Sequence, residues 1–270
     1  MRRAAVLVRE GPHYRIDAFR AGLVRLGYAI GQPEKSPDAG DLLLIWNRYG
    51  EGDRWARIYE AAGATVVVAE NGYLGRDWRD GIWYALALDW NAGAGHWPVG
   101  GPERAAMFDA DLKPWRRPGH YTVVLAQRGI GSPPVSQPPG WHQRVAHELG
   151  HRGHQPVIRG HPGKDQDNGN LYAQLDRAAC AVTWASGAAV KALIYGVPVY
   201  HGLPNWIGAP AARPYGKALA EPFRGDRGEF LTRLAWAMWT VEEIGSGYAF
   251  DHLLRGPQEA VQPGHLRGVC

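Results

Sequence analysis

Residues 157–200 read VIRGHPGKDQDNGNLYAQLDRAACAVTWASGAAVKALIYGVPVY and decide the fold of this chain. Short apolar runs alternate there with helical segments, and the runs fall at 156–158, 180–184 and 197–200. A helix is expected at 170–179 and another from Ser186 onward. Strands that alternate with helices of this length predict parallel β-α-β units. Open sheets of this kind bind ligands beyond the carboxyl ends of their strands, where this stretch has polar residues and glycines.

A second series of apolar runs precedes this stretch. These runs fall at 4–8, 41–46 and 65–69, and each ends in a polar turn. Apolar residues recur with helical spacing at 14–26, and Asp53 is expected to cap a helix that reaches residue 62. Together these units predict a first Rossmann-like lobe.

The middle of the chain connects this lobe to a second one. Residues 93–118 are rich in glycine, proline and tryptophan with weak periodicity, which is typical of a connection. Beyond the quoted stretch, the second lobe is expected to contain a strand at 121–126 and helices at 141–150 and 229–244. We therefore predict an α/β fold with two Rossmann-like lobes facing a cleft, at 1–117 and 118–270. B-type glycosyltransferases have this arrangement, but so do periplasmic binding proteins and other two-lobed folds.

The composition is that of an ordinary globular chain of 270 residues, 45% hydrophobic and 21% charged. No apolar run approaches the ~20 residues of a membrane span, and the N-terminus lacks the apolar segment of a signal peptide. Two cysteines, Cys180 and Cys270, make no disulfide framework. A reducing cytoplasm is therefore the expected location.

Basic and aromatic residues bear on the kind of partner. The net charge is +4, and the chain has 12 tryptophans, many of them beside arginine or asparagine. This combination indicates either an ordinary solvated surface or a polyanionic substrate whose bases or sugars stack on exposed rings.

The string HELGH at 147–151 matches the HExxH signature of zinc peptidases, in which two histidines one helical turn apart bind the metal. The apolar stripe of the expected helix is Trp141, Val145 and Leu149. Both histidines lie roughly 200° from that stripe at about 100° per residue, so we expect them to face solvent. Gly150 also ends the helix where zinc peptidases continue it. We expect no metal site here and keep the zinc peptidase as an alternative.

Polar and basic residues follow two neighbouring strands of the quoted stretch. They are Arg159, His161 and Lys164 after the first strand, and Thr183, Ser186 and Gly187 after the second. Arginine, lysine and histidine donate hydrogen bonds to phosphate, and a helix N-terminus receives one. The first group could instead be a turn built on proline and glycine. Paired with the second, it predicts a nucleotide site.

Acidic residues of the first lobe are candidates for a general base. Glu70 ends a strand within ENGYL at 70–74, where a carboxylate facing a cleft could accept a proton. A carboxylate that only caps a turn is the structural alternative. His13 and Asp17, near the first strand–helix loop, could also reach an acceptor hydroxyl, although Asp17 could be merely a first-turn helix acid.

Several of these motifs resemble those of capsule-polysaccharide transferases that move the acidic sugar Kdo. ENGYL resembles the family's E-D-G-F-L/I motif, and Gln127 its strand-ending glutamine. His161 and Pro162 resemble its HP motif, and 186–200 resembles its S-x3-E-A-L-x-x-G-x-P-V segment. The motifs occur in the same order. The resemblance implies a glycosyltransferase whose HP motif binds a cytidine nucleotide.

Two residues depart from the family's pattern. Asn71 stands where the family has an acid, which bears on the catalytic acid. Lys191 stands where a glutamate usually precedes A-L, which bears on the donor. The chain is also short for that family and lacks an evident membrane-association segment.

We therefore expect a metal-independent glycosyltransferase that takes a nucleotide sugar as co-substrate and needs no cofactor. The donor would bind the second lobe through Gln127, Arg128, Arg159, His161, Lys164, Thr183, Ser186 and Gly187. The acceptor would lie near Trp46, Asn47, Arg48, Asn71 and Arg76 of the first lobe. Glu70, His13 or Asp17 would deprotonate the acceptor hydroxyl.

The acceptor has two candidates. The resemblance favours a saccharide. Charge, size and the abundance of Trp and Arg slightly favour a hydroxymethylated base in DNA, because small phage-type DNA glucosyltransferases also have this two-lobed form and a base modifier must extract and stack its target. Outside the enzymes, a non-catalytic nucleotide- or sugar-binding protein is the alternative.

Overall fold

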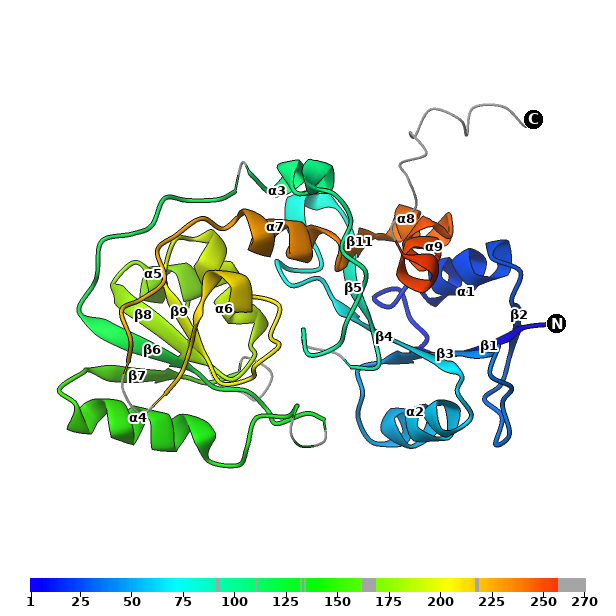
Figure 1. The fold of residues 1–270 in the computed structure, drawn as a ribbon, viewed down its shortest axis with the longest axis horizontal. Coiled ribbons are helices and arrows are strands. Elements are labelled where there is room, and N and C mark those ends of the chain that lie inside the picture. Colours follow the sequence, from blue (N-terminus) through cyan, green and yellow to red (C-terminus); the bar gives the residue numbers. More distant parts are fainter. Residues whose placement is uncertain are drawn as a thin grey trace.

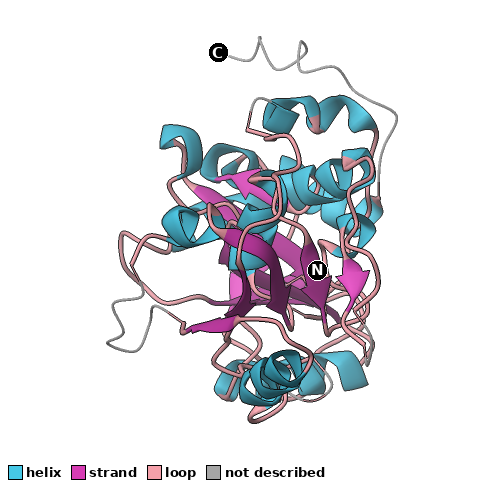
Figure 2. Ribbon diagram, turned by 90° about the vertical axis from the view of Figure 1, so that its left-hand side faces the viewer, coloured by secondary structure: helices cyan, strands magenta, loops and turns pink. Residues whose placement is uncertain are grey.

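The computed structural model describes residues 1–90, 93–109, 111–131, 133, 135–161, 169–216 and 219–256. Its strands form two sheets, one of six strands and one of five, that lie in two lobes (Figure 1). Helices lie on both sides of the strands (Figure 2). This layering is the one expected when parallel strands are buried on both faces.

The six-stranded sheet has the order β11-β5-β4-β3-β1-β2. Its strands are β1 (Arg3–Leu7), β2 (Ala29–Gly31), β3 (Leu42–Trp46), β4 (Thr65–Asn71), β5 (Trp83–Leu88) and β11 (Met238–Thr240). The first four are mutually parallel, whereas β5 pairs antiparallel with β4 and β11. Side chains alternate along β3, so Leu44 packs toward α1 (Ile16–Arg25) and Ile45 toward α2 (Glu51–Ala61).

The five-stranded sheet has the order β10-β9-β8-β6-β7 and is parallel throughout. Its strands are β6 (Tyr121–Leu125), β7 (Pro156–Arg159), β8 (Ala178–Thr183), β9 (Val199–His201) and β10 (Arg213–Pro214). Helix α4 (Trp141–His151) covers the face that carries Val124 and Val182. Helices α5 (Leu171–Leu175) and α6 (Gly187–Ile194) cover the opposite face, which carries Val123 and Ala181.

The C-terminal part of the chain returns to the first sheet. Helix α7 (Gly228–Ala235) leads into β11, then α8 (Val241–Gly245) and α9 (Tyr248–Arg255). Both last helices pack on α1, where a Cβ added to Gly22 would lie only 2.0 Å from the Ile244 carbonyl oxygen. Residues 238–255 thus belong with the six-stranded sheet. A division into two domains at residue 117 stays a prediction.

Three local expectations are corrected. The single helix expected at 229–244 is wrong, because Met238–Thr240 pairs with β5 and this long-range pairing overrides the helical spacing. Helix α5 is shorter than expected, since its neighbour β8 already begins at Ala178. Asp53 does not cap α2, which begins at Glu51 after Gly50, and its carboxylate binds Arg48 instead.

Short elements complete the fold. They are α3 (Ala106–Asp109) and 3₁₀ turns at Trp78–Asp80, Pro102–Arg104 and Ala209–Ala211. Within the part of the chain that the structure describes, no helix has the length and apolar character needed to cross a membrane.

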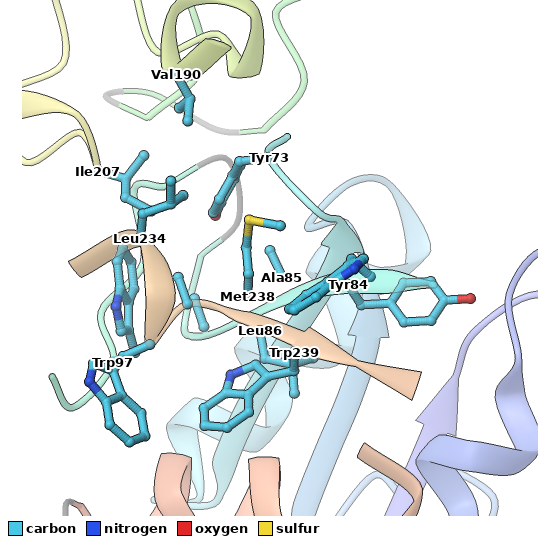
Figure 3. Packing of buried hydrophobic residues seen from close by; sticks show 14 of the residues in the cluster. Tyr73, Tyr84, Ala85, Leu86, Trp97, Val190, Ile207, Leu234, Met238 and Trp239 are labelled. Carbon is cyan, nitrogen blue, oxygen red and sulfur yellow. The ribbon is translucent and has the colours of Figure 1, made fainter. Parts of the chain in front are cut away.

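An apolar core joins the two lobes. Tyr73, which follows β4, and Met238 of β11 lie in one buried cluster with Val190 of α6 and Ile207 (Figure 3). The approach is close at Gly93, where an added Cβ would lie 2.8 Å from the Ile207 side chain. One part of the boundary between the lobes is therefore packed like a protein interior.

Candidate functional site

A cavity of about 490 Å³ opens elsewhere along the boundary between the lobes. Its walls come from the segments that follow β3, β4, β6, β7 and β8. Of the predicted site residues, it is lined by Asn47, Glu70, Asn71 and Arg76 of the first lobe, and by Gln127, Arg128, Arg159, His161, Ser186 and Gly187 of the second. The carboxyl ends of parallel strands meet at one edge of a sheet, which is why residues so far apart in sequence converge here.

Other predicted residues do not line this cavity. Trp46, Arg48, His13, Asp17 and Thr183 lie outside its walls. Lys164 lies outside the described residues. Thr183 nevertheless contacts a residue of the cavity wall, because its hydroxyl accepts a hydrogen bond from the Ser186 amide at 2.9 Å. His13 is hydrogen-bonded to Arg76, a residue of the cavity wall, with 2.7 Å between His13 Nδ1 and Arg76 Nη1.

Glu70 is held by a buried tyrosine that the sequence did not single out. The Tyr73 hydroxyl donates to Glu70 Oε1 at 2.9 Å and accepts from the Gly93 amide at 3.0 Å. Burial and the neighbouring Glu70 carboxylate raise the pKa of Tyr73 well above its ordinary value, so it stays a neutral donor. The carboxylate therefore points in a defined direction at the end of β4.

Two side chains brace the turn between β8 and α6. Gln127 Oε1 accepts from the Ala185 amide at 2.8 Å, and the Ser186 hydroxyl caps α6 by accepting from the Ala188 amide at 3.2 Å. Gln137, from the proline-rich loop after β6, accepts from the Gln127 amide at 3.2 Å. The strand-ending glutamine thus positions the start of α6. This loop lines the cavity as well, although sequence reasoning treated it only as a connection.

Basic groups concentrate on the second-lobe side. Arg159 donates to Gln174 Oε1 at 2.9 Å and to the Gly169 carbonyl at 3.0 Å. Burial lowers the pKa of Arg159. Burial, together with the charge of Arg128, lowers the pKa of His161 below its ordinary value of 6.5. His161 is therefore neutral near pH 7, with one ring nitrogen able to donate and the other to accept.

Lys191 is a cavity residue that sequence analysis noted only as a departure from a motif. It projects from the half-buried side of α6 into the same cavity. Burial lowers the pKa of its ammonium group. A Cβ added to Gly75, in the loop after β4, would lie 3.8 Å from Lys191 Nζ. This ammonium group therefore stands where the two lobes meet.

Two of the residues expected on the acceptor side, Arg48 and Trp46, make contacts inside the first lobe. Arg48 is 3% exposed and binds Asp53, Glu60 and the Asp89 carbonyl oxygen. Trp46 packs edge-on against Tyr14, with ring centroids 5.0 Å apart.

Trp78 stacks on Phe108 at 4.7 Å with nearly parallel rings. Arg79, beside it, pairs with Asp111 at 2.9 Å. These contacts occupy part of the aromatic and cationic surface that a DNA acceptor would use.

The HELGH string lies on the exposed side of α4. The helix buries Trp141, Val145 and Leu149, as its apolar spacing predicts, and both histidines are exposed. Their Nε2 atoms lie 3.0 Å apart, and Glu148 accepts from the Tyr215 hydroxyl at 2.9 Å. A catalytic zinc site needs three protein ligands. No group of three or more metal-binding side chains occurs among the residues whose positions are described.

A second cavity, of about 540 Å³, lies at the opposite end of the five-stranded sheet. It is lined by residues that precede β6 and β8, among them Arg116, Arg117 and Arg177. Arg116 is paired there with Asp176 at 2.8 Å. We place the functional site in the interlobe cavity, because open α/β sheets bind ligands at the carboxyl ends of their strands.

Comparisons with known proteins extend the description of the fold. No protein-family model and no curated protein matches the sequence. Among solved structures, the chain is similar to Thermosulfurimonas dismutans KpsC, beta Kdo 2,4 transferase, with a TM-score of 0.55 and 14% identity over 86% of this chain and 89% of that chain. It is also similar to the beta Kdo 2,7 transferase of the same KpsC, with a TM-score of 0.53 and 15% identity over 92% and 99%.

At this identity the likeness establishes the fold. The expected α/β fold with two Rossmann-like lobes is confirmed.

Proposed function

We propose that this protein is a glycosyltransferase that moves a sugar from a nucleotide-sugar donor to a hydroxyl group of a saccharide. The observation that carries the proposal is the interlobe cavity, in which a strand-end carboxylate of one lobe shares a space with basic groups of the other. The likeness of the fold to the KpsC Kdo transferases supports it.

The second lobe would hold the nucleotide. Negative charge develops on the phosphate when the bond to the sugar breaks, and preorganised donors stabilise that charge. Arg128, Arg159 and His161 are such donors at the ends of β6 and β7. The N-terminus of α6, capped by Ser186, adds the positive end of a helix dipole.

The first lobe would supply the base. Glu70 would take the proton of the acceptor hydroxyl as that oxygen attacks the sugar, and Tyr73 would hold the carboxylate in place. Of the three residues considered for this role, Glu70 lines the cavity, whereas His13 and Asp17 do not. The side chain of Asp17 is 96% exposed on the first turn of α1. We therefore assign the base to Glu70.

A saccharide is preferred here to the DNA base that charge and size favoured. Arg48 is neutralised inside the first lobe, and Trp46 and Trp78 pack against neighbouring rings. A DNA acceptor needs basic side chains that release counterions from phosphates, so its affinity would fall steeply with salt. Titration of fluorescent duplex DNA at several salt concentrations tests it. Micromolar binding with a steep slope would restore DNA as the acceptor.

The decisive experiment is a transfer assay on the purified protein. Nucleotides that raise the melting temperature are found first, because a ligand that binds only the native state stabilises it. The corresponding nucleotide sugars are then offered with saccharides ending in Kdo and with DNA containing hydroxymethylated bases. Glu70→Gln is expected to slow transfer about 10²- to 10⁴-fold without weakening nucleotide binding.

Glu51→Gln, at an exposed position at the start of α2, is the matched control and should transfer normally. Normal transfer by Glu70→Gln would remove Glu70 as the base. If no nucleotide bound the wild-type protein, the glycosyltransferase itself would be rejected, and a non-nucleotide ligand would have to be sought for the cavity.

A further inference from the structure

Lys191 is the only charged residue of α6, whose sequence is GAAVKALI. Its neighbours Val190 and Ala192 are fully buried, and Lys191 itself is half-buried in the wall of the interlobe cavity. Among the described residues, none forms an ion pair or a hydrogen bond with its ammonium group. Removing an ammonium group from water without a partner is costly, so an apolar residue would be the stable choice here.

The remaining charges of the cavity do not neutralise this ammonium group. The carboxylate in the wall, Glu70, is bound by Tyr73. Arg76, also in the wall, already has Asp77 as its partner at 2.9 Å. The described lining thus has more positive than negative groups, and its unpaired ammonium group stands at the lobe boundary. A ligand that complements this lining is an anion.

The position of Lys191 separates it from the other basic groups of the second lobe. Arg128 and His161 follow β6 and β7, whereas Lys191 lies on the helix that follows β8. In the sheet, β8 lies next to β6 and two strands from β7, so Lys191 reaches the cavity from a different strand end than Arg128 and His161. Lys191 is also the one beside Gly75 of the first lobe. The cavity therefore has a positively charged group on α6 in addition to the basic residues that follow β6 and β7.

We propose that Lys191 anchors a second anionic group of the donor, distinct from the phosphate held by Arg128, Arg159 and His161. This inference rests on the proposed function and narrows its donor. The donor has two anionic groups, either because it is a nucleoside diphosphate sugar or because a nucleoside monophosphate is joined to an acidic sugar. Lys191 would then favour donors that have a second anionic group over donors that have only one.

Calorimetric titration of the wild-type protein and of Lys191→Met tests this inference. The ligands are nucleoside monophosphates, nucleoside diphosphates, and cytidine monophosphate joined to a sugar acid. We expect the wild type to bind one of the two ligands that have a second, separate anionic group about tenfold or more tightly than the monophosphate, as one charge-assisted bond provides. Lys191→Met should abolish that preference and leave monophosphate affinity unchanged.

Two further variants make the result specific. Lys191→Arg keeps the charge and should keep the preference, and Lys35→Met, at an exposed position of the first lobe, should behave as the wild type. A gain for diphosphates identifies the second group as a phosphate, whereas a gain for the sugar-acid conjugate identifies a carboxylate.

Equal loss of affinity for all ligands in Lys191→Met, or no loss at all, would overturn the role of Lys191 while leaving the glycosyltransferase intact. If the wild type bound no nucleotide, the proposed function and this inference would fall together. The two failures are thus distinguished by the wild-type titration.

Discussion

Two basic residues of strand–helix units, Arg48 between β3 and α2 and Lys191 within α6, have opposite surroundings. Arg48 is 3% exposed and is surrounded by Asp53, Glu60 and a carbonyl oxygen. Burial alone would lower the pKa of Arg48, but the hydrogen bonds that it donates to Glu60 and Asp53 outweigh this effect and hold the pKa above its ordinary value. Lys191 is half-buried, and burial lowers the pKa of its ammonium group without a compensating carboxylate.

This difference separates a structural cation from a cation that is available to a ligand. The partners of Arg48 come from α2 and from the end of β5, so it ties these elements to the end of β3. The surroundings of Lys191 contribute apolar packing and an open cavity. A cation that already has its anions contributes to stability, whereas one that lacks them contributes to binding when an anion arrives.

The largest effect is expected from Arg48→Met. Removing the guanidinium group leaves Asp53 and Glu60 without their main partner in a partly buried place, which should lower the free energy of unfolding by about 3 kcal/mol. Urea denaturation measures this change, and Lys191→Met should show no comparable loss. A stable Arg48→Met variant with impaired acceptor binding would instead return Arg48 to the acceptor site.

His161→Ala should weaken nucleotide binding without unfolding the chain. His161 lies in the cavity wall that also contains Arg128 and Arg159, and losing one hydrogen bond to a charged phosphate costs ~1.5–3 kcal/mol. Calorimetric titration gives the affinity, and thermal unfolding reports on the fold. His120→Ala, at an exposed position away from this cavity, is the control. Unchanged affinity in a folded variant would remove His161 from the site.

The lowered pKa of Lys191 makes anion binding sensitive to alkaline pH. The ammonium group loses its proton at a lower pH than an ordinary lysine, whose pKa is 10.5. Affinity for a nucleotide with a second anionic group should therefore fall as pH rises through the lowered pKa. Lys191→Arg keeps its charge to well above pH 10 and should not show this fall. Titrations from neutral pH to about pH 10 compare the two proteins. Parallel curves would show that another group titrates.

The same shift predicts the sign of an effect on stability. The folded state disfavours the charged form of Lys191, so the residue lowers stability at pH values below the pKa of the unfolded chain. That cost disappears as pH rises and both states become neutral. Lys191→Met should therefore be slightly more stable than the wild type near neutral pH, and the difference should shrink toward alkaline pH.

Much of the lining of this cavity followed from the sequence, because strand-end position is a local property. Glu70, His161 and Ser186 end apolar runs or open helices, and parallel strands bring such positions to one edge. The partners of Arg48 and the stacking of Trp78 on Phe108 could not be read in this way. They depend on contacts between residues distant in sequence, which hydrophobic periodicity does not encode. The pairing of β11 with β5 escaped prediction for the same reason.

Ser186→Ala should have a smaller effect, on stability rather than chemistry. The Ser186 hydroxyl caps α6 by accepting from the Ala188 amide, and loss of such a cap costs about 1 kcal/mol. Urea denaturation should show this loss of unfolding free energy. Ser186→Gly should lose only a few tenths of a kcal/mol. A large fall in nucleotide affinity with unchanged stability would mean that the hydroxyl contacts the donor directly.

The smallest effect is expected from the two histidines of HELGH. His147 and His151 are exposed on α4, on the side away from Trp141, Val145 and Leu149, and they contact each other rather than the interlobe cavity. Replacing both with alanine should leave nucleotide binding and transfer within error of the wild type, because exposed substitutions away from a site change little. This outcome contrasts with His161→Ala, which changes a histidine in the cavity wall. Metal analysis of the purified protein completes the test: stoichiometric zinc that is lost from the double variant, together with lost activity, would return the chain to the zinc peptidases.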